Sequence, residues 1–168
     1  LKLEKKRLKT VQEFDDEMDV NLFVNEKPAF VGKVQKLTEI EPIDVYAKDI
    51  PQMENVPENT IDNDFSTRWS SEKLGTMIDF DLGAVQPPTH VGVAFLDGAA
   101  RSTFYRIAVS EDAENWTYVK NIKSTGTTEE LDIYYIGDHN VRYVRLQGYG
   151  NTQGSLWFSP TEVAFFAK

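Results

Sequence analysis

A series of short apolar runs, each of strand length and each followed by turn-forming residues, constrains the fold of this chain most. The run TMIDFDLG alternates strictly, with Ile78, Phe80 and Leu82 on one face of an extended chain and Asp79 and Asp81 on the other. YRIAVS alternates in the same way, and HVGVAFL, LDIYYI, VRYVRLQG and EVAFFA are rich in residues that favour strands. Turn-rich segments such as SEDAEN and KSTGTTEE separate them. The pattern predicts an all-β fold, an antiparallel β-sandwich or jelly roll of about eight strands.

This pattern occupies residues 38–168, which we expect to form one domain. Residues 1–37 differ. Residues 1–19 carry apolar side chains at helical spacing, which predicts a helix, and two apolar runs around Asn25–Pro28 predict a hairpin. We interpret residues 1–37 as a short appendage, a linker or the tail of a preceding domain, and we expect the chain to be a piece of a longer protein.

The charge of the chain excludes some classes of partner. The net charge is −9, and residues 38–168 hold 20 Asp and Glu against 10 Lys and Arg. So acidic a body disfavours nucleic acid and anionic membranes, because both are bound through clustered cations. The chain has no cysteine, so disulfides and thiolate metal sites are excluded.

The stretch NTIDNDFSTRW, residues 59–69, gathers many oxygen-bearing side chains. It is not an EF-hand loop, because counting from Asp62 places Thr67 where Gly is required and Lys73 where Glu is required. A solvated turn is one interpretation. Phe65 and Trp69 favour a loop packed on a core, and oxygen ligands without His or Cys suit Ca²⁺. The residues alone leave both interpretations open.

The segment ENVPENTIDNDFSTRWSSE resembles the opening signature of the discoidin, or coagulation factor 5/8 type C, fold. Within that fold the resemblance is closest to family 32 carbohydrate-binding modules, especially those attached to bacterial polysaccharide lyases. The segments MIDFDLG, VGVAFLDGAARSTFYRIAVSEDAENWTYV and RYVRLQGYGNTQGSLWFSPTEVAFF follow in the family's order, so the resemblance covers residues 40–167.

The resemblance implies a structural Ca²⁺ held by the oxygen-rich loop and by a Glu of the last strand. The implied ligands are the carbonyl of Asn59, the side chains of Asp62, Asp64 and Thr67, the carbonyl of Thr161 and the side chain of Glu162. The sequence supports one of them independently. Val163 and Phe165 in PTEVAFF should face the core, so the neighbouring acidic Glu162 needs a partner.

The resemblance also implies that loops at one end of the sandwich bind a sugar. Such a site needs a flat aromatic ring and a few planar polar groups. The candidate ligand-binding residues are Asn55, Asp97, Arg101, Tyr149, Asn151 and Trp157. Many sugar-binding members place an Arg and an Asn at the positions of Arg101 and Asn151. Trp157 is either a stacking platform or a core residue, and Tyr149, between two glycines, is expected to be exposed.

We do not expect an enzyme. No GxSxG, P-loop, HExxH or Rossmann fingerprint occurs, and neither His90 nor His139 lies in a context that indicates a base. We expect a secreted, extracellular module that anchors an attached bacterial enzyme to a polysaccharide. The lyase association favours a uronic-acid polymer such as alginate, while the acidic body disfavours a polyanion. The alternative is a discoidin-type adhesion domain that binds a protein or lipid partner.

Overall fold

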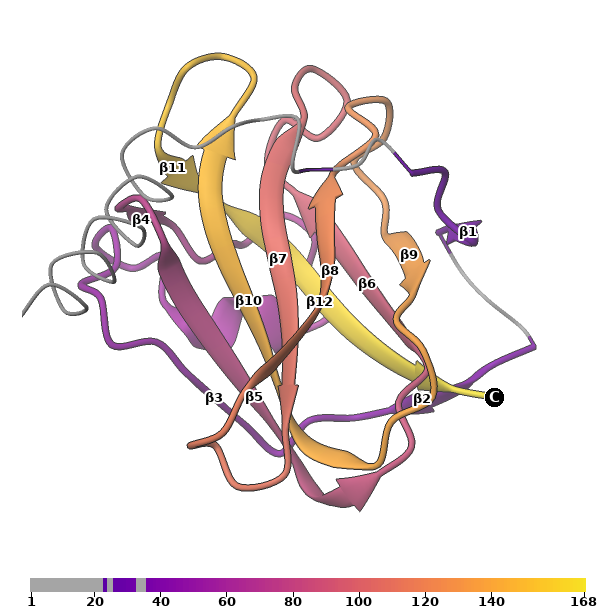
Figure 1. Cartoon of the computed structure of the whole chain (residues 1–168). Coiled ribbons are helices and arrows are strands. Elements are labelled where there is room, and N and C mark those ends of the chain that lie inside the picture. Colours follow the sequence, from indigo (N-terminus) through magenta and orange to yellow (C-terminus); the bar gives the residue numbers. More distant parts are fainter. Residues whose placement is uncertain (1–22, 24–25, 33–35) are drawn as a thin grey trace, which may run out of the picture.

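Two antiparallel five-stranded sheets face each other in a computed structural model of the chain, which describes residues 23, 26–32 and 36–168 (Figure 1). In one sheet the order is β1 (Phe30–Val31), β9 (Asp132–Tyr135), β6 (His90–Phe95), β12 (Pro160–Ala167) and β2 (Thr38–Ile40). In the other it is β3 (Asp44–Tyr46), β5 (Thr76–Gln86), β10 (Val141–Asn151), β7 (Thr103–Ser110) and β8 (Thr117–Lys123). We call them the β12 sheet and the β10 sheet.

A two-stranded ribbon of β4 (Ser71–Glu72) and β11 (Trp157–Phe158), together with a 3₁₀ helix, η2 (Pro57–Ile61), completes the described fold. The predicted antiparallel sandwich is confirmed. The described residues form twelve strands, more than the eight or so predicted, because five of them contain only two or three residues. Among the described residues, no helix is long and apolar enough to cross a membrane.

The core follows the alternation of the sequence. Ile78, Phe80 and Leu82 are buried between the sheets. The carboxylates of Asp79 and Asp81 lie on the outer face of the β10 sheet and form two-point ion pairs with arginines of β10. Burial of one face and pairing on the other fixes the register of β5 against β10, since a slip of one residue would exchange the two faces.

The described residues before position 38 contact the sandwich. β1 pairs with β9 through Phe30 and Val31, opposite Ile133 and Asp132, and Phe23 is 4% exposed. Described residues on the N-terminal side of the expected boundary between residues 37 and 38 thus pack against the sandwich. The strand formed within the predicted hairpin pairs with β9. The helix predicted over residues 1–19 lies outside the described residues.

Candidate functional site

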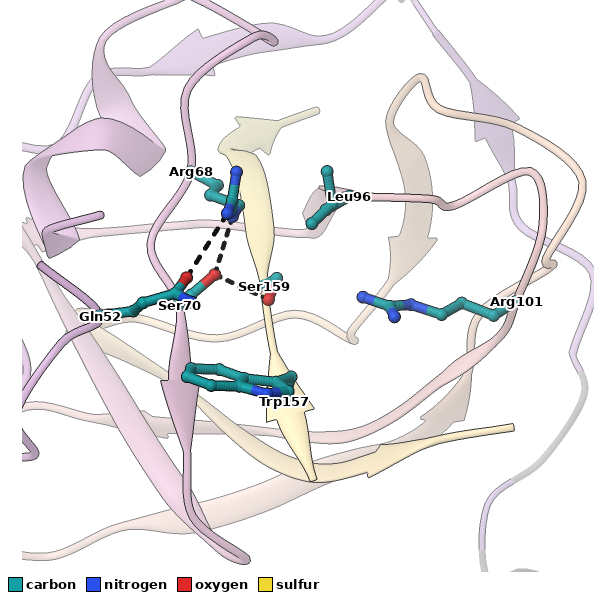
Figure 2. A pocket seen from close by; sticks show the side chains of 7 residues that line it. All are labelled: Gln52, Arg68, Ser70, Leu96, Arg101, Trp157 and Ser159. Atoms are coloured by element: carbon teal, nitrogen blue, oxygen red, sulfur yellow. Dashed lines mark hydrogen bonds between the residues drawn. The ribbon is translucent and has the colours of Figure 1, made fainter. Parts of the chain in front are cut away.

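A shallow pocket of about 150 Å³ opens at one end of the sandwich, beside the β4–β11 ribbon (Figure 2). Its lining residues are Gln52, Arg68, Ser70, Leu96, Arg101, Trp157 and Ser159. Strand alternation brings several of them there. Trp69 and Phe158 are buried in the core and meet edge to face, with ring centroids 5.8 Å apart. Their neighbours in sequence therefore point the other way, toward the pocket.

A network of uncharged groups orients Arg68. Its Nε donates to the hydroxyl of Ser70 at 3.0 Å, and its Nη2 donates to the Oε1 of Gln52 at 3.4 Å. The Ser70 hydroxyl in turn donates to the hydroxyl of Ser159 at 2.8 Å. These partners hold the guanidinium in place without neutralising its charge.

Arg101 extends into the same pocket from the loop between β6 and β7 (Figure 2). Its Nη1 donates to the Oε1 of Gln153 at 3.3 Å, while its Nε is buried and has no hydrogen-bond partner. Among the described residues, no carboxylate forms an ion pair with Arg68 or Arg101. Because an unpaired buried N–H is costly, a bound ligand with a hydrogen-bond acceptor would satisfy a group that the described residues leave unpaired.

Two larger hollows on the surface have the opposite charge. One, of about 610 Å³, is lined in part by Glu111, Asp112 and Asp138, and the other, of about 560 Å³, in part by Glu39 and Glu130. Neither contains an arginine or lysine among its lining residues. The pocket with Arg68 and Arg101 is therefore better suited to an anionic ligand than either of these hollows.

The predicted ligand residues Arg101 and Trp157 line the pocket, and Trp157 is half-buried there. Asn55 is not among the lining residues but contacts one of them: its side-chain amide donates to the Oε1 of Gln52 at 3.0 Å. Asp97 has an exposed side chain and a positive φ of 55°, and its carbonyl accepts from the amide of Arg101. Asn55 and Asp97 thus shape the segments that carry lining residues.

Tyr149 and Asn151 differ more from expectation. Tyr149 is 3% exposed, because the rings of Phe23 and Phe104 pack with it, so the predicted exposure is wrong. Asn151 is 5% exposed and is not among the lining residues. Its side chain instead makes hydrogen bonds across the loop of residues 151–157.

Sequence reasoning missed the other residues of the pocket. They are Gln52, Arg68, Ser70, Leu96 and Ser159. A signal for three of them was present, because assigning Trp69 and Phe158 to the core places Arg68, Ser70 and Ser159 on the opposite face of their segments. Gln52 and Leu96 lie at the edges of loops and carry no comparable pattern.

The oxygen-rich loop brings several acceptors to one hydroxyl. The Oγ1 of Thr67 lies within hydrogen-bond distance of a carboxylate oxygen of Asp62, the carbonyl of Asp64 at 3.0 Å and the carbonyl of Asn59 at 3.4 Å. A hydroxyl has one proton and donates to one of these at a time. The acceptors therefore outnumber the donor, as in a cage for a hard cation. The Asp64 carboxylate turns toward Ser66, whose hydroxyl donates to it at 2.6 Å.

Glu162 on β12 adds a further acceptor without a partner. It is 5% exposed, and its Oε2 has no hydrogen bond. Burial, and to a smaller extent the nearby carboxylates of Asp62, Glu39 and Asp64, raise the pKa of Glu162 to about 8, against the lowering effect of the Asn63 amide. The hydroxyl of Thr161 is also buried without a partner.

Among the described residues, no three His, Cys, Asp or Glu side chains gather as a metal-binding group. A cation at the oxygen-rich loop would therefore use carbonyl and hydroxyl oxygens besides carboxylates. The unsatisfied Glu162 oxygen and the excess of acceptors around Thr67 fit such a cation. All of these ligands are hard oxygens, which is the donor set that Ca²⁺ takes in proteins.

Comparison with known structures identifies close relatives. The chain is 35% identical to the CBM32 of AlyQ in complex with 4,5-unsaturated mannuronic acid, with a TM-score of 0.74 over 78% of this chain and 99% of that chain. It is 34% identical to truncated AlyQ with CBM32 and alginate lyase domains, with a TM-score of 0.75, and the match covers 80% of this chain and 34% of that one. The chain thus spans about a third of truncated AlyQ.

A pectin-binding carbohydrate-binding module shares the fold at 19% identity, with a TM-score of 0.70 over 75% of this chain and 91% of that chain. A comparison with curated protein sequences gave no match. The family model of the F5/8 type C domain matches residues 46–163. The resemblance inferred from the sequence is confirmed, and the chain belongs to the F5/8 type C domain family.

Proposed function

We propose that this chain is a non-catalytic carbohydrate-binding module that holds a uronic-acid unit in the pocket of Arg68, Arg101 and Trp157. The observation that carries the proposal is that two arginines line one pocket and that neither pairs with a carboxylate in the described part of the chain. Guanidinium groups match the planar carboxylate with two parallel hydrogen bonds. The indole offers an apolar face to the C–H groups of a sugar ring. A uronate combines both partners in one unit.

The acidic body does not prevent binding of an acidic sugar at this pocket. No Asp or Glu is among the lining residues. Charges farther away are screened over about 8 Å at physiological ionic strength. The two arginines therefore dominate the local field, and the rest of the surface opposes nonspecific binding of a polyanion. The uronate found with the AlyQ module, a relative of 35% identity, supports this choice over a neutral sugar.

The wider setting that we propose is attachment to a secreted enzyme that acts on polysaccharide outside the cell. It rests on AlyQ, whose truncated form joins a CBM32 to an alginate lyase domain. The pocket of about 150 Å³ is small beside the roughly 300–1,000 Å³ of most ligand pockets, so we expect modest affinity. Repeated units along a polymer would compensate through rebinding.

The proposal includes a structural calcium ion bound by the oxygen-rich loop and Glu162. Asn59, Asp62, Asp64 and Thr67 would hold it from the loop, and Thr161 and Glu162 from β12. The ion would satisfy the partnerless oxygen of Glu162 and join the loop to a central strand of the β12 sheet. Its contribution is stability, because an ion bound only by the native state shifts the folding equilibrium toward that state.

Calorimetric titration with a pair of ligands tests the acidic-sugar proposal. Oligouronates are compared with the same oligomers after chemical reduction of their carboxylates to alcohols. We expect the acidic form to bind at least tenfold more tightly, and Arg68→Ala and Arg101→Ala to remove this difference.

Arg142→Ala is the matched control for these variants. It also deletes one arginine, but that arginine pairs with Asp81 on the outer face of the β10 sheet, so affinity should not change. Equal affinity of the wild type for both oligomers would contradict a uronate ligand. Undiminished binding by both pocket variants would refute the site.

A second candidate, adhesion to a lipid or protein, is favoured by one observation. Ile50 and Met53 are 90% and 84% exposed, on either side of the pocket residue Gln52. Exposed apolar side chains at a loop tip suit insertion into an apolar surface. Sedimentation with lipid vesicles, set against binding to a glycan array, separates the candidates. Binding to vesicles and to no glycan would favour adhesion.

A further inference from the structure

A small aromatic cluster lies beside the proposed sugar site, on the outer face of the β10 sheet. Tyr105 points into the core, so its neighbour Phe104 lies on the outer face, where it meets Tyr149 of β10. Phe23 covers both: its ring centroid is 5.6 Å from that of Phe104 and 5.5 Å from that of Tyr149. Leu74 completes the cluster. A residue outside the matched family segment thus buries a surface of the domain.

The cluster covers an irregularity in the sheet. The pairing of β10 with β7 shifts between Gly148 and Asn151, so Tyr149 lies within a bulge. Gly150 in this bulge has a φ of +85°, and a Cβ there would lie 2.7 Å from the carbonyl oxygen of Ser155. A bulge interrupts the ladder of hydrogen bonds and redirects the strand. The ladder alone therefore does not fix the direction in which residues 151–157 leave the sheet.

The two loops on either side of this bulge are bonded to each other. The amide of Thr152 donates to the carbonyl of Ser102 at 2.9 Å, and the amide of Ser102 donates to the hydroxyl of Thr152 at 3.0 Å. Arg101 contacts Gln153 in the same loop. A change in the direction of one loop is thereby transmitted to the other, and with it to the pocket residues Arg101 and Trp157.

We infer that Phe23 is a positioning residue for the sugar pocket. Its ring clamps Phe104 against Tyr149 across the bulge, and so fixes the two loops that present Arg101 and Trp157. The inference rests on the proposed function for the identity of the ligand. It makes a segment that precedes the family domain part of the binding module.

Two described residues that follow Phe23 supply matched controls, because they contact other parts of the sandwich. Glu26 forms an ion pair with Lys120 of β8, with 2.6 Å between its Oε2 and the Nζ of Lys120. The ring of Phe30 lies 6.0 Å from that of His90, beside the pairing of β1 with β9. Figure 1 shows residues 26–32 leading to β1, which lies beside β9. Substitutions at Glu26 and Phe30 loosen the segment without touching the bulge.

The test compares Phe23→Ala, Phe23→Leu, Glu26→Gln and Phe30→Ala in the full chain. The affinity for an oligouronate, the melting temperature and the amide hydrogen exchange of residues 101–104 and 149–157 are measured for each. We expect Phe23→Ala to weaken binding roughly tenfold and to accelerate exchange at Asn151 and Thr152. Phe23→Leu should restore most of both. Glu26→Gln and Phe30→Ala should lower the melting temperature and leave affinity unchanged.

Two outcomes would overturn the inference. One is unchanged affinity and exchange in Phe23→Ala, and the other is an equal loss of affinity in the two control variants. If Phe23→Ala does not fold, Phe23→Leu and the controls still decide the question. If the wild type binds no uronate, the proposed function fails separately. Exchange at the loops then tests the clamp, and equal rates in the wild type and the Phe23 variants would refute it.

Discussion

The side-chain amide of Asn151 donates a hydrogen bond to the main-chain carbonyl of Trp157 at 3.3 Å. Its Oδ1 accepts from the amide of Gln153 at 3.1 Å. Asn151, predicted to bind the ligand, therefore closes the loop that presents the indole of Trp157.

Asn151→Ala should lower both stability and sugar affinity. The change removes two hydrogen bonds of a buried amide, and we expect a loss of roughly 1–3 kcal/mol in the free energy of unfolding. Thermal denaturation and calorimetric titration measure the two effects. Arg101→Ala, in contrast, removes a half-buried side chain with one long hydrogen bond, and should abolish binding with little change in melting temperature. An Asn151→Ala protein as stable as the wild type would contradict the loop-closing role.

Trp157→Ala should weaken oligouronate binding by roughly tenfold or more, because it removes the flat apolar wall of the pocket. Trp157→Phe keeps an aromatic face and should retain a large part of the affinity. Titration calorimetry with both variants measures the difference. Since Phe158, and not Trp157, is fully buried, both variants should stay folded. Equal affinities of Trp157→Ala and the wild type would show that Trp157 does not bind the sugar.

Removal of calcium should lower the melting temperature of the wild type. If calcium is present at about 100 times its dissociation constant, the expected stabilisation is about 2.7 kcal/mol. Glu162→Gln deletes a charged ligand and should respond little to EDTA or to added Ca²⁺. Asp138→Asn, at an exposed acid far from the loop in sequence, should respond like the wild type. A wild-type melting temperature that is the same in EDTA and in excess Ca²⁺ would exclude the ion.

In the absence of calcium, the stability of the folded protein should depend on pH through Glu162. Burial raises the pKa of Glu162 to about 8 in the ion-free protein, above the ordinary value of 4.5. Between these values the folded state keeps a proton that the unfolded chain has lost, so stability falls as pH rises from 4.5 to 8. Melting curves in EDTA at pH 5, 6.5 and 8 measure this slope. Glu162→Gln should flatten it, and the same slope in the variant would assign the titration to another group.

The sequence predicted those parts of the fold that are determined by residues close together in the chain. In β5 the alternation of apolar and polar residues matches the face that the structure buries and the face that it leaves partly exposed. In β7 and β12 nearly every residue is buried, so the alternation there does not separate a buried face from an exposed one. Strands of two or three residues, such as β4 and β11, are too short to show a period and are defined by their partners. Their existence depends on contacts between distant segments.

The candidate site was also predicted only in part, because some of its residues depend on contacts between distant segments. Arg101 and Trp157 were found because the resemblance and the loop composition both indicated them, and they line the pocket. The prediction that Tyr149 is exposed was wrong because Phe23, whose ring packs against it, lies 126 positions earlier in the chain. The sequence around Gly148 and Gly150 does not indicate a contact with a residue so far away in the chain.

Residues 59–70 carry three tasks in immediate succession. The oxygen-rich loop ends at Thr67, Arg68 enters the pocket, Trp69 fills the core and Ser70 returns to the pocket. A designer who wishes to transplant sugar specificity between such modules therefore cannot exchange this stretch in parts, since an insertion or deletion of one residue would exchange the places of Arg68 and Trp69. In the loop of residues 97–102, the exposed Ala99 and Ala100 belong neither to the core nor to the pocket lining, and they are the better positions at which to diversify the module.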